Sequence, residues 1–313
     1  MSATSTAVLG FRRLGVYASF VRFEHTLFSL PLILAGLFSE PGPPLSALRW
    51  LLIALGAVGA RTSAMALNRL IDRRLDALNP RTQGRELPAG RMKLAEALAM
   101  VLVSTAAYLI ACAALGPWFL RVAAVPLVVF AGYPYLKRFT PLCHFGVGLA
   151  LALAPLAGYA AAHPGLEQPG VALWLAGFAL AWVSGFDIIY ATLDEEFDRA
   201  HRVHSMVAWL GRKRALQVSG VLHLIAFSCL LQAARELWNG PLVSSWTPWA
   251  IPALSLLLAT AAALLYLEQR WAQDVNLAFF KVNVYVGFVV LGIVLVARAA
   301  GGGFFEHSPV GRF

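Results

Sequence analysis

The chain is poor in charged residues and makes little use of cysteine. Only 13% of its 313 residues are charged, against 59% that are hydrophobic, and the mean hydropathy is +0.69. Soluble domains carry about twice that share of charge, so the composition excludes an ordinary soluble enzyme. The three cysteines, Cys112, Cys143 and Cys229, lack the spacing of a disulfide framework or a zinc site. These absences favour an integral membrane protein.

The chain also lacks the features that divide a sequence into parts. No repeat, low-complexity segment or linker rich in Pro, Gly and Ser interrupts it. Its first residues do not follow the basic, apolar and cleavage-site order of a signal peptide. We therefore expect one domain over 1–313, with a cytoplasmic segment at 1–21 and a short tail at 301–313.

What the chain has in abundance is apolar runs long enough to cross a bilayer, which takes about 20 residues in a helix. They predict an all-α, multi-pass membrane protein with nine transmembrane helices. The expected spans lie near 24–39, 47–68, 94–115, 117–136, 143–162, 171–193, 215–234, 247–267 and 282–299.

Basic residues concentrate in the loops of one side of the membrane. They gather at 69–93, 137–138, 199–214 and 270–281, whereas the loops of the other side carry few. The positive-inside rule places the basic side, and the N-terminus, in the cytoplasm. We expect the inner (plasma) membrane as the location. Because the net charge of +9 follows these loops, membrane lipid and anionic substrates are the expected partners, and nucleic acid is not.

The first acidic motif, NRLIDRRLD, ends the second expected span. Asn68, Asp72 and Asp76 follow one another at intervals of four residues. That spacing stacks side chains on one face of a helix. The motif predicts a column of oxygen ligands where an apolar helix meets water.

The second acidic motif, DIIYATLDEEFD, ends the sixth expected span. Asp187, Tyr190, Asp194 and Asp198 are spaced by three, four and four residues, so a single helix would align them as well. Carboxylates at membrane depth are costly and usually functional. A purely structural ion-pair network is the alternative interpretation.

Carboxylate oxygens with this spacing suit Mg²⁺, which commonly bridges carboxylates to substrate phosphates. Both motifs are followed by basic loops that could bind diphosphate oxygens. The candidates there are Arg73 after the first motif, Arg199 after the second, and Tyr133, Lys137 and Arg138 between the fourth and fifth spans. Snorkelling and the positive-inside rule explain such cations too.

Two further arginines fall at or inside the cytoplasmic half of a span. Arg22 precedes the first span, and Arg61 lies seven residues before Asn68, on the same helical face. An arginine at such depth needs an anionic partner, which could be a substrate carboxylate. Interfacial anchoring is the alternative for Arg22.

With these motifs the sequence resembles the UbiA-type intramembrane aromatic prenyltransferases. That family has nine helices, N-x-x-x-D-x-x-x-D after the second and D-x-x-x-D after the sixth. The resemblance implies that Asp72, Asp76, Asp194 and Asp198 hold Mg²⁺ and that Asn68 helps to bind the diphosphate of a polyprenyl donor. It implies a helical bundle around a central active site that faces the cytoplasm.

Within the family, the quinone branch has a loop similar to NPRTQGRELPAGR of this chain. A sub-branch of 4-hydroxybenzoate polyprenyltransferases has segments similar to FEHTLFSLP and DEEFDR. The resemblance implies prenyl transfer to a hydroxylated aromatic carboxylate. The acceptor that this resemblance implies is 4-hydroxybenzoate of the ubiquinone pathway or a dihydroxynaphthoate of the futalosine route to menaquinone. Asp187, Tyr190 and Arg61 are the expected catalytic residues, with Arg22 or Arg61 on the acceptor carboxylate.

Other functions remain to be compared with this one. Haem O and chlorophyll synthases share the chemistry. An ion-coupled transporter also uses intramembrane carboxylates, but near the bilayer midplane rather than at one interface. A CDP-alcohol phosphotransferase would need Asp-Gly in its motif, whereas Ala77 and Leu78 follow Asp76.

Overall fold

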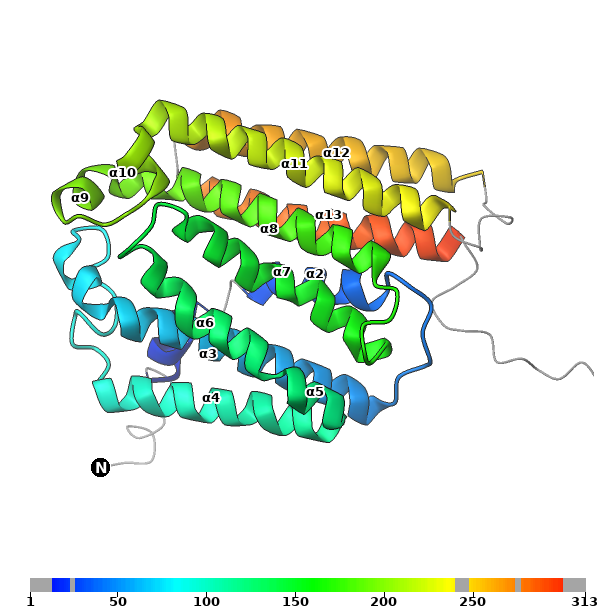
Figure 1. Ribbon diagram of the computed structural model, residues 1–313, viewed down its shortest axis with the longest axis horizontal. Coiled ribbons are helices and arrows are strands. Elements are labelled where there is room, and N and C mark those ends of the chain that lie inside the picture. The colour runs from blue at the N-terminus through cyan, green and yellow to red at the C-terminus, as the bar shows by residue number, and fades with distance from the viewer. Residues whose placement is uncertain (1–12, 23–25, 240–247, 274–276, 301–313) are drawn as a thin grey trace, which may run out of the picture. The chain divides into compact units, whose positions relative to one another are not determined.

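The computed structural model describes residues 13–22, 26–239, 248–273 and 277–300. The regular elements in these ranges are helices (Figure 1). The all-α, multi-pass prediction is therefore confirmed. Most of the predicted N-terminal segment and the whole tail at 301–313 lie outside the described residues.

The chain groups into two compact units. One comprises Met1–Thr26 and Leu51–Tyr135, and the other Leu27–Trp50 and Leu136–Phe313. We call them the first and second unit. The first acidic motif belongs to the first unit and the second motif to the second unit. The single domain over 1–313 stays a prediction.

The first unit contains most of the long helix α3 and the helices that follow it. They are α3 (Ala47–Leu78), α4 (Leu94–Leu115), α5 (Pro117–Val122) and α6 (Ala124–Leu136). Gly59 lets α3 approach α4 closely, since a β-carbon there would lie 2.9 Å from the Ser104 carbonyl oxygen. One turn on, the hydroxyls of Ser63 and Thr105 are 2.8 Å apart and hydrogen-bond across the same interface. These contacts fix the helix that carries the first motif.

A helix over 13–20 packs against the start of α4. Phe20 is buried with Ala66 and Ala97, and the Tyr17 hydroxyl donates a 3.0 Å hydrogen bond to Glu96. That hydrogen bond raises the pKa of Tyr17 above its ordinary value. The N-terminal helix is thus held on the surface of the first unit by apolar and polar contacts.

The second unit is built around α8 (Gly170–Ala191). The other elements are α2 (Thr26–Leu37), α7 (Cys143–Ala162), η2 (Thr192–Asp194), α9 (Glu195–Ala200), α10 (Met206–Leu210), α11 (Arg212–Asn239), α12 (Ala250–Arg270), η4 (Trp271–Gln273) and α13 (Leu277–Ala300). Helix α8 lies between α7 and α11, as Figure 1 shows. It is the most buried of the spans, which suits a helix that must hold functional groups in place.

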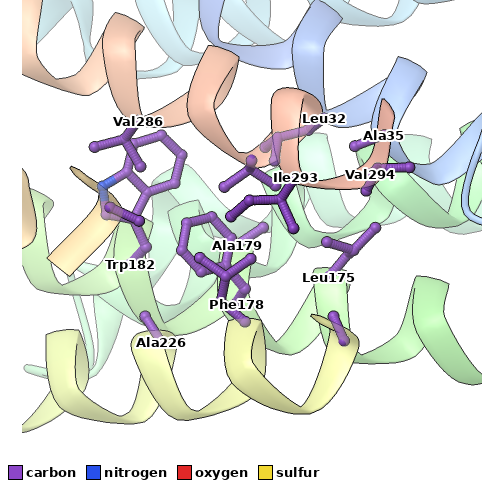
Figure 2. Close-up of a cluster of buried hydrophobic side chains, with 14 of the residues drawn as sticks. Leu32, Ala35, Leu175, Phe178, Ala179, Trp182, Ala226, Val286, Ile293 and Val294 are labelled. Carbon is purple, nitrogen blue, oxygen red and sulfur yellow. The ribbon is translucent and has the colours of Figure 1, made fainter. Parts of the chain in front are cut away.

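The core of this unit is apolar and centred on α8. Phe178 and Trp182 stack with ring centroids 5.4 Å apart, and Figure 2 shows Ile293 of α13 and Leu32 of α2 in the same cluster. Burying a large apolar side chain contributes about 1.5–3 kcal/mol. This packing holds α8 from several sides.

Polar contacts fix the last turns of α8 as well. The Ser219 hydroxyl of α11 donates to the Gly185 carbonyl at 2.7 Å, and the Trp182 indole donates to the fully buried Glu268 of α12 at 3.2 Å. Gln269 donates to Ser219 at 2.7 Å. The segment just before Asp187 is therefore tied to two neighbouring helices.

Eight helices among the described residues are long and apolar enough to cross a membrane. They are Ala47–Leu78, Leu94–Leu115, Pro117–Leu136, Cys143–Ala162, Gly170–Ala200, Arg212–Trp238, Ala250–Arg270 and Val282–Ala300. The predicted count of nine is thus one too high for the part of the chain described. The span expected at 24–39 corresponds to α2, whose 12 residues rise only about 18 Å at 1.5 Å per residue. That is short of the roughly 30 Å hydrocarbon layer.

Candidate functional site

The first acidic motif lies on one unbroken helix, as its spacing predicts. Asn68, Asp72 and Asp76 all belong to α3, which continues to Leu78. Asn68 is half-buried, and the exposed fractions of Asp72 and Asp76 are only 1% and 7%. Two carboxylates are therefore withdrawn from solvent at the end of an apolar helix.

The loop at 79–93 folds back onto the end of α3. Arg85 donates from Nη1 to Oδ1 of Asp76 at 2.7 Å, and the Thr82 hydroxyl donates to the Asp76 backbone carbonyl at 3.1 Å. Glu86 accepts a 2.6 Å hydrogen bond from the Ser19 hydroxyl. The loop is therefore turns rather than one helix, as its prolines and glycines predict. Arg85 thus links the loop directly to a motif carboxylate.

Arg69, next to Asn68, is a site residue that the sequence reasoning missed. Its exposed fraction is 5%. Its Nε and Nη1 have no hydrogen-bond partner among the residues that the structure describes. The available signal was a charged residue at the end of an apolar span, inside the motif itself.

The other predicted cations of the first unit differ in their surroundings. Arg73 donates from Nη1 to the Leu70 carbonyl of its own helix at 2.8 Å. Arg61 is half-buried in α3, seven residues before Asn68, and Tyr133 is half-buried in α6. Arg22 is exposed in a turn, with φ of 48°. Arg61 and Asn68 share a helical face, as predicted.

The second acidic motif lies on a helical segment that is not one uninterrupted α-helix, and on this point the prediction was wrong. Helix α8 ends at Ala191, the 3₁₀ turn η2 follows, and α9 begins at Glu195. Asp194 has φ of −112° and is the N-cap of α9. A 3₁₀ turn rotates by about 120° per residue rather than 100°. The 3₁₀ turn therefore interrupts the regular α-helical spacing within the motif.

Asp187 is held by a histidine that the sequence reasoning missed. His144, at the start of α7, is buried, and its Nδ1 lies 2.6 Å from Oδ2 of Asp187. The Met206 amide donates to His144 Nε2 at 3.2 Å. A nitrogen that accepts an N–H carries no proton, so Nδ1–H donates to Asp187 and the ring is neutral. The available signal was an ionisable residue in the first turn of an apolar span.

The remaining residues of the second motif differ in exposure. Tyr190 is 44% exposed and Asp198 is 8% exposed. Lys137 is among the cations whose charge acts on Asp198, and its carbonyl accepts the His204 amide at 2.7 Å. The segment after α6 and the loop after α9 therefore lie together, as a shared phosphate site would require. Arg138 is half-buried next to Lys137.

Arg199 makes a different contact from the one expected of a substrate ligand. Its Nη2 lies 2.9 Å from Oε1 of Glu195, one turn back on α9, with about half of the arginine side chain exposed. His201 stacks on Phe197, with ring centroids 4.1 Å apart. In this structure the cation of Arg199 is thus balanced within its own short helix.

The donor chemistry of both motifs fits a hard divalent cation. Each supplies two carboxylates four residues apart, Asp72 with Asp76 and Asp194 with Asp198, and oxygen ligands are what Mg²⁺ prefers. Among the described residues, no group of three or more His, Cys, Asp or Glu side chains gathers at one point. Each motif by itself therefore leaves ligand positions for water and substrate oxygens, as Mg²⁺ sites commonly do.

Comparisons with known proteins agree with this chemistry. Residues 29–285 match the model of the UbiA prenyltransferase family. The chain is 30% identical over 227 residues to a 4-hydroxybenzoate octaprenyltransferase of Shewanella denitrificans, covering 71% of this chain and 75% of the relative. It is 29% identical over 256 residues to a 4-hydroxybenzoate solanesyltransferase of Synechocystis, covering 78% and 81%.

Solved structures show the same fold. The apo structure of a UbiA homologue from Aeropyrum pernix superposes with a TM-score of 0.75 at 30% identity, covering 87% of this chain and 98% of that one. A UbiA homologue from Archaeoglobus fulgidus, bound to GPP and Mg²⁺, gives a TM-score of 0.66 at 18% identity, with 91% and 99% covered.

Proposed function

Because the chain belongs to the UbiA prenyltransferase family, we propose that it transfers a polyprenyl group from a polyprenyl diphosphate to a hydroxylated aromatic carboxylate, in a Mg²⁺-dependent reaction. The proposed acceptor is 4-hydroxybenzoate, since the relatives from Shewanella and Synechocystis are both named for it. The observation that carries the proposal is the burial of Asp72 and Asp76 at the end of a helix of membrane-spanning length. Carboxylates at membrane depth are costly and are usually functional.

Asp72 and Asp76 are proposed to hold the cation on the first motif, and Asp194 and Asp198 on the second. Bound Mg²⁺ supplies positive charge that favours departure of the diphosphate. Asn68, Arg73, Tyr133, Lys137, Arg138 and Arg199 are proposed to bind the diphosphate. The role of Lys137 is supported by its electrostatic interaction with Asp198, which places this cation near a proposed metal carboxylate. The apolar helices exclude water that would otherwise capture the allylic cation.

The acceptor ring is proposed to bind near Asp187. The ring carbon ortho to the hydroxyl forms the new C–C bond as the allylic C–O bond breaks, and a base then removes the ring proton. Asp187 suits the last task, because His144 uses only one of its two carboxylate oxygens. Tyr190 is proposed to contact the acceptor or the diphosphate, and Arg22 or Arg61 to bind the acceptor carboxylate.

An acceptor panel tests this function. Purified protein, Mg²⁺ and a polyprenyl diphosphate are incubated with 4-hydroxybenzoate, a dihydroxynaphthoate or phenol, and prenylated products are identified by mass spectrometry. We expect 4-hydroxybenzoate to be prenylated and phenol to react poorly, because phenol lacks the carboxylate. Preference for the dihydroxynaphthoate would move the protein to the menaquinone route, and equal use of phenol would refute the anion requirement.

The active site is proposed to face the cytoplasm of the inner membrane. Single cysteines at Gly84 and His201 should label only from the cytoplasmic side, and one at Glu167 only from the other side. All three positions are exposed, and a β-carbon at Gly84 meets no atom within 4 Å. Labelling of Gly84 and Glu167 from the same side would refute this orientation.

A further inference from the structure

We propose that Arg69 is a diphosphate-binding residue, whose guanidinium takes a phosphoryl oxygen of the prenyl diphosphate. This inference rests on the proposed function and adds to it a residue outside the predicted set. Its basis is the first unit alone.

Arg69 is buried, and two of its three guanidinium nitrogens make no hydrogen bond to a residue that the structure describes. With 5% of its surface exposed, it keeps Nε and Nη1 without a hydrogen-bond partner among the described residues. These two nitrogens belong to the rigid fork with which guanidinium binds carboxylates and phosphates. Burying a cation without partners costs stability, so a protein keeps one where a ligand completes the site.

The carboxylates near Arg69 are engaged by other groups. The acidic side chains whose charges act on it are Asp76 and Glu86. Asp76 accepts from Arg85 at 2.7 Å, and Glu86 accepts from Ser19 at 2.6 Å. Neither supplies a hydrogen bond to the two open nitrogens. The two nitrogens of Arg69 are therefore open to an acceptor oxygen of a ligand.

The charge balance around Arg69 favours an anion with several oxygens. The charges of Arg85 and Arg22 also act on Arg69, and the two acids are already paired, Asp76 with Arg85 at 2.7 Å and Glu86 with Arg91 at 3.7 Å. Asp72, one turn along α3, is the carboxylate proposed for the cation. A diphosphate is the part of the substrates that carries several negative oxygens, and guanidinium binds phosphoryl groups in a forked geometry. Arg69 is therefore placed to hold diphosphate beside the metal carboxylates.

The competing account is that Arg69 only balances the charge of Asp76 and Glu86. The two accounts predict opposite effects on stability. A counterion stabilises the ligand-free protein, so its removal lowers the unfolding temperature. A cation that waits for a ligand destabilises the ligand-free protein, so replacing it by an apolar residue of similar length raises that temperature.

The test compares the full-length wild type with Arg69→Met in detergent. Thermal unfolding is followed with and without inorganic diphosphate and Mg²⁺. We expect Arg69→Met to unfold at a higher temperature than the wild type without ligand, and to lose most of the stabilisation by diphosphate. The KM for prenyl diphosphate should rise about 10- to 100-fold, the range of one or two charged hydrogen bonds, with the acceptor KM within about twofold. Arg121→Met, at an exposed arginine of α5, is the matched control and should leave all three readouts unchanged.

Two results would overturn the inference. A lower unfolding temperature for Arg69→Met with full stabilisation by diphosphate would make Arg69 a counterion. Loss of stabilisation by 4-hydroxybenzoate, with that by diphosphate intact, would assign Arg69 to the acceptor carboxylate instead. If Arg69→Met does not fold, Arg69→Lys replaces it in the test, because lysine keeps the positive charge but lacks the forked guanidinium. An unchanged affinity of Arg69→Lys for inorganic diphosphate would also overturn the inference.

The proposed function can fail separately. Binding of inorganic diphosphate needs no aromatic acceptor. A wild type that prenylates no aromatic compound, yet is stabilised by diphosphate through Arg69, would overturn the proposed acceptor chemistry and support the diphosphate site.

Discussion

The two acidic motifs share the D-x-x-x-D spacing but are held in different ways. The first lies on the unbroken helix α3, and its Asp76 is paired with the permanent cation of Arg85. The second is broken by the 3₁₀ turn η2, and Asp187 before it accepts from the neutral ring of His144. The same spacing thus occurs in two electrostatic settings. Spacing alone does not fix the role of a carboxylate.

The difference has a chemical consequence. Arg85 places a permanent cation 2.7 Å from Oδ1 of Asp76, and metal ions bind carboxylates in their ionised form. A neutral histidine orients Asp187 without adding charge, and leaves its second oxygen for another partner. We interpret the first motif as a site for ions and the residues around Asp187 as a site for moving a proton.

The largest expected effect tests whether both motifs are needed. Asp72→Ala and Asp194→Ala should each lower turnover at least about 100-fold, because each removes a proposed ligand of the cation that would stabilise the departing diphosphate. The measurement is initial-rate prenylation, with EDTA as a parallel arm. Glu196→Ala, at an exposed acid of the second motif, is the control and should stay within about twofold. Full activity of Asp194→Ala would show that the cation is held by the first motif without the second.

The next effect concerns the proton-transfer interpretation of Asp187. His144→Phe should lower kcat about 10- to 100-fold. This loss is smaller than the loss expected on removing the general base itself, because Asp187 remains in the variant. The KM for prenyl diphosphate should stay nearly unchanged. His144→Asn places an amide N–H near the position of Nδ1–H and should restore most of the loss. Equal losses in the two variants would show that His144 acts through packing rather than through its hydrogen bond to Asp187.

The smallest effect separates the arginines of the two motifs. Arg85→Ala should lower the free energy of unfolding by about 1–3 kcal/mol, because Asp76 stays buried without its charged partner. Arg199→Ala removes only a half-exposed pair with Glu195 and should cost less than about 0.5 kcal/mol. Chemical denaturation in detergent measures both. A larger loss for Arg199→Ala would contradict the contrast between a buried and a surface pair.

Much of the fold could be predicted because membrane helices are defined by local composition. The apolar runs gave the long helices, and α3 ends just beyond Asp76 as the first motif required. For the described residues the count was one too high, because the span expected at 24–39 contains a described helix of only 12 residues. The second motif was misjudged because a spacing of four fits a helix equally well with or without a 3₁₀ turn inside it.

The sequence by itself determined the membrane class, the family resemblance and the identity of the motif carboxylates, since these follow from composition and from residues close together in the chain. Only the tertiary structure decided which groups those carboxylates meet. His144 reaches Asp187 across 43 positions, and Arg85 reaches Asp76 through a folded loop. Arg69 is left with open donors because its acidic neighbours bond elsewhere. Hydrogen bonds between distant residues depend on the packing of whole helices, and no local spacing encodes them.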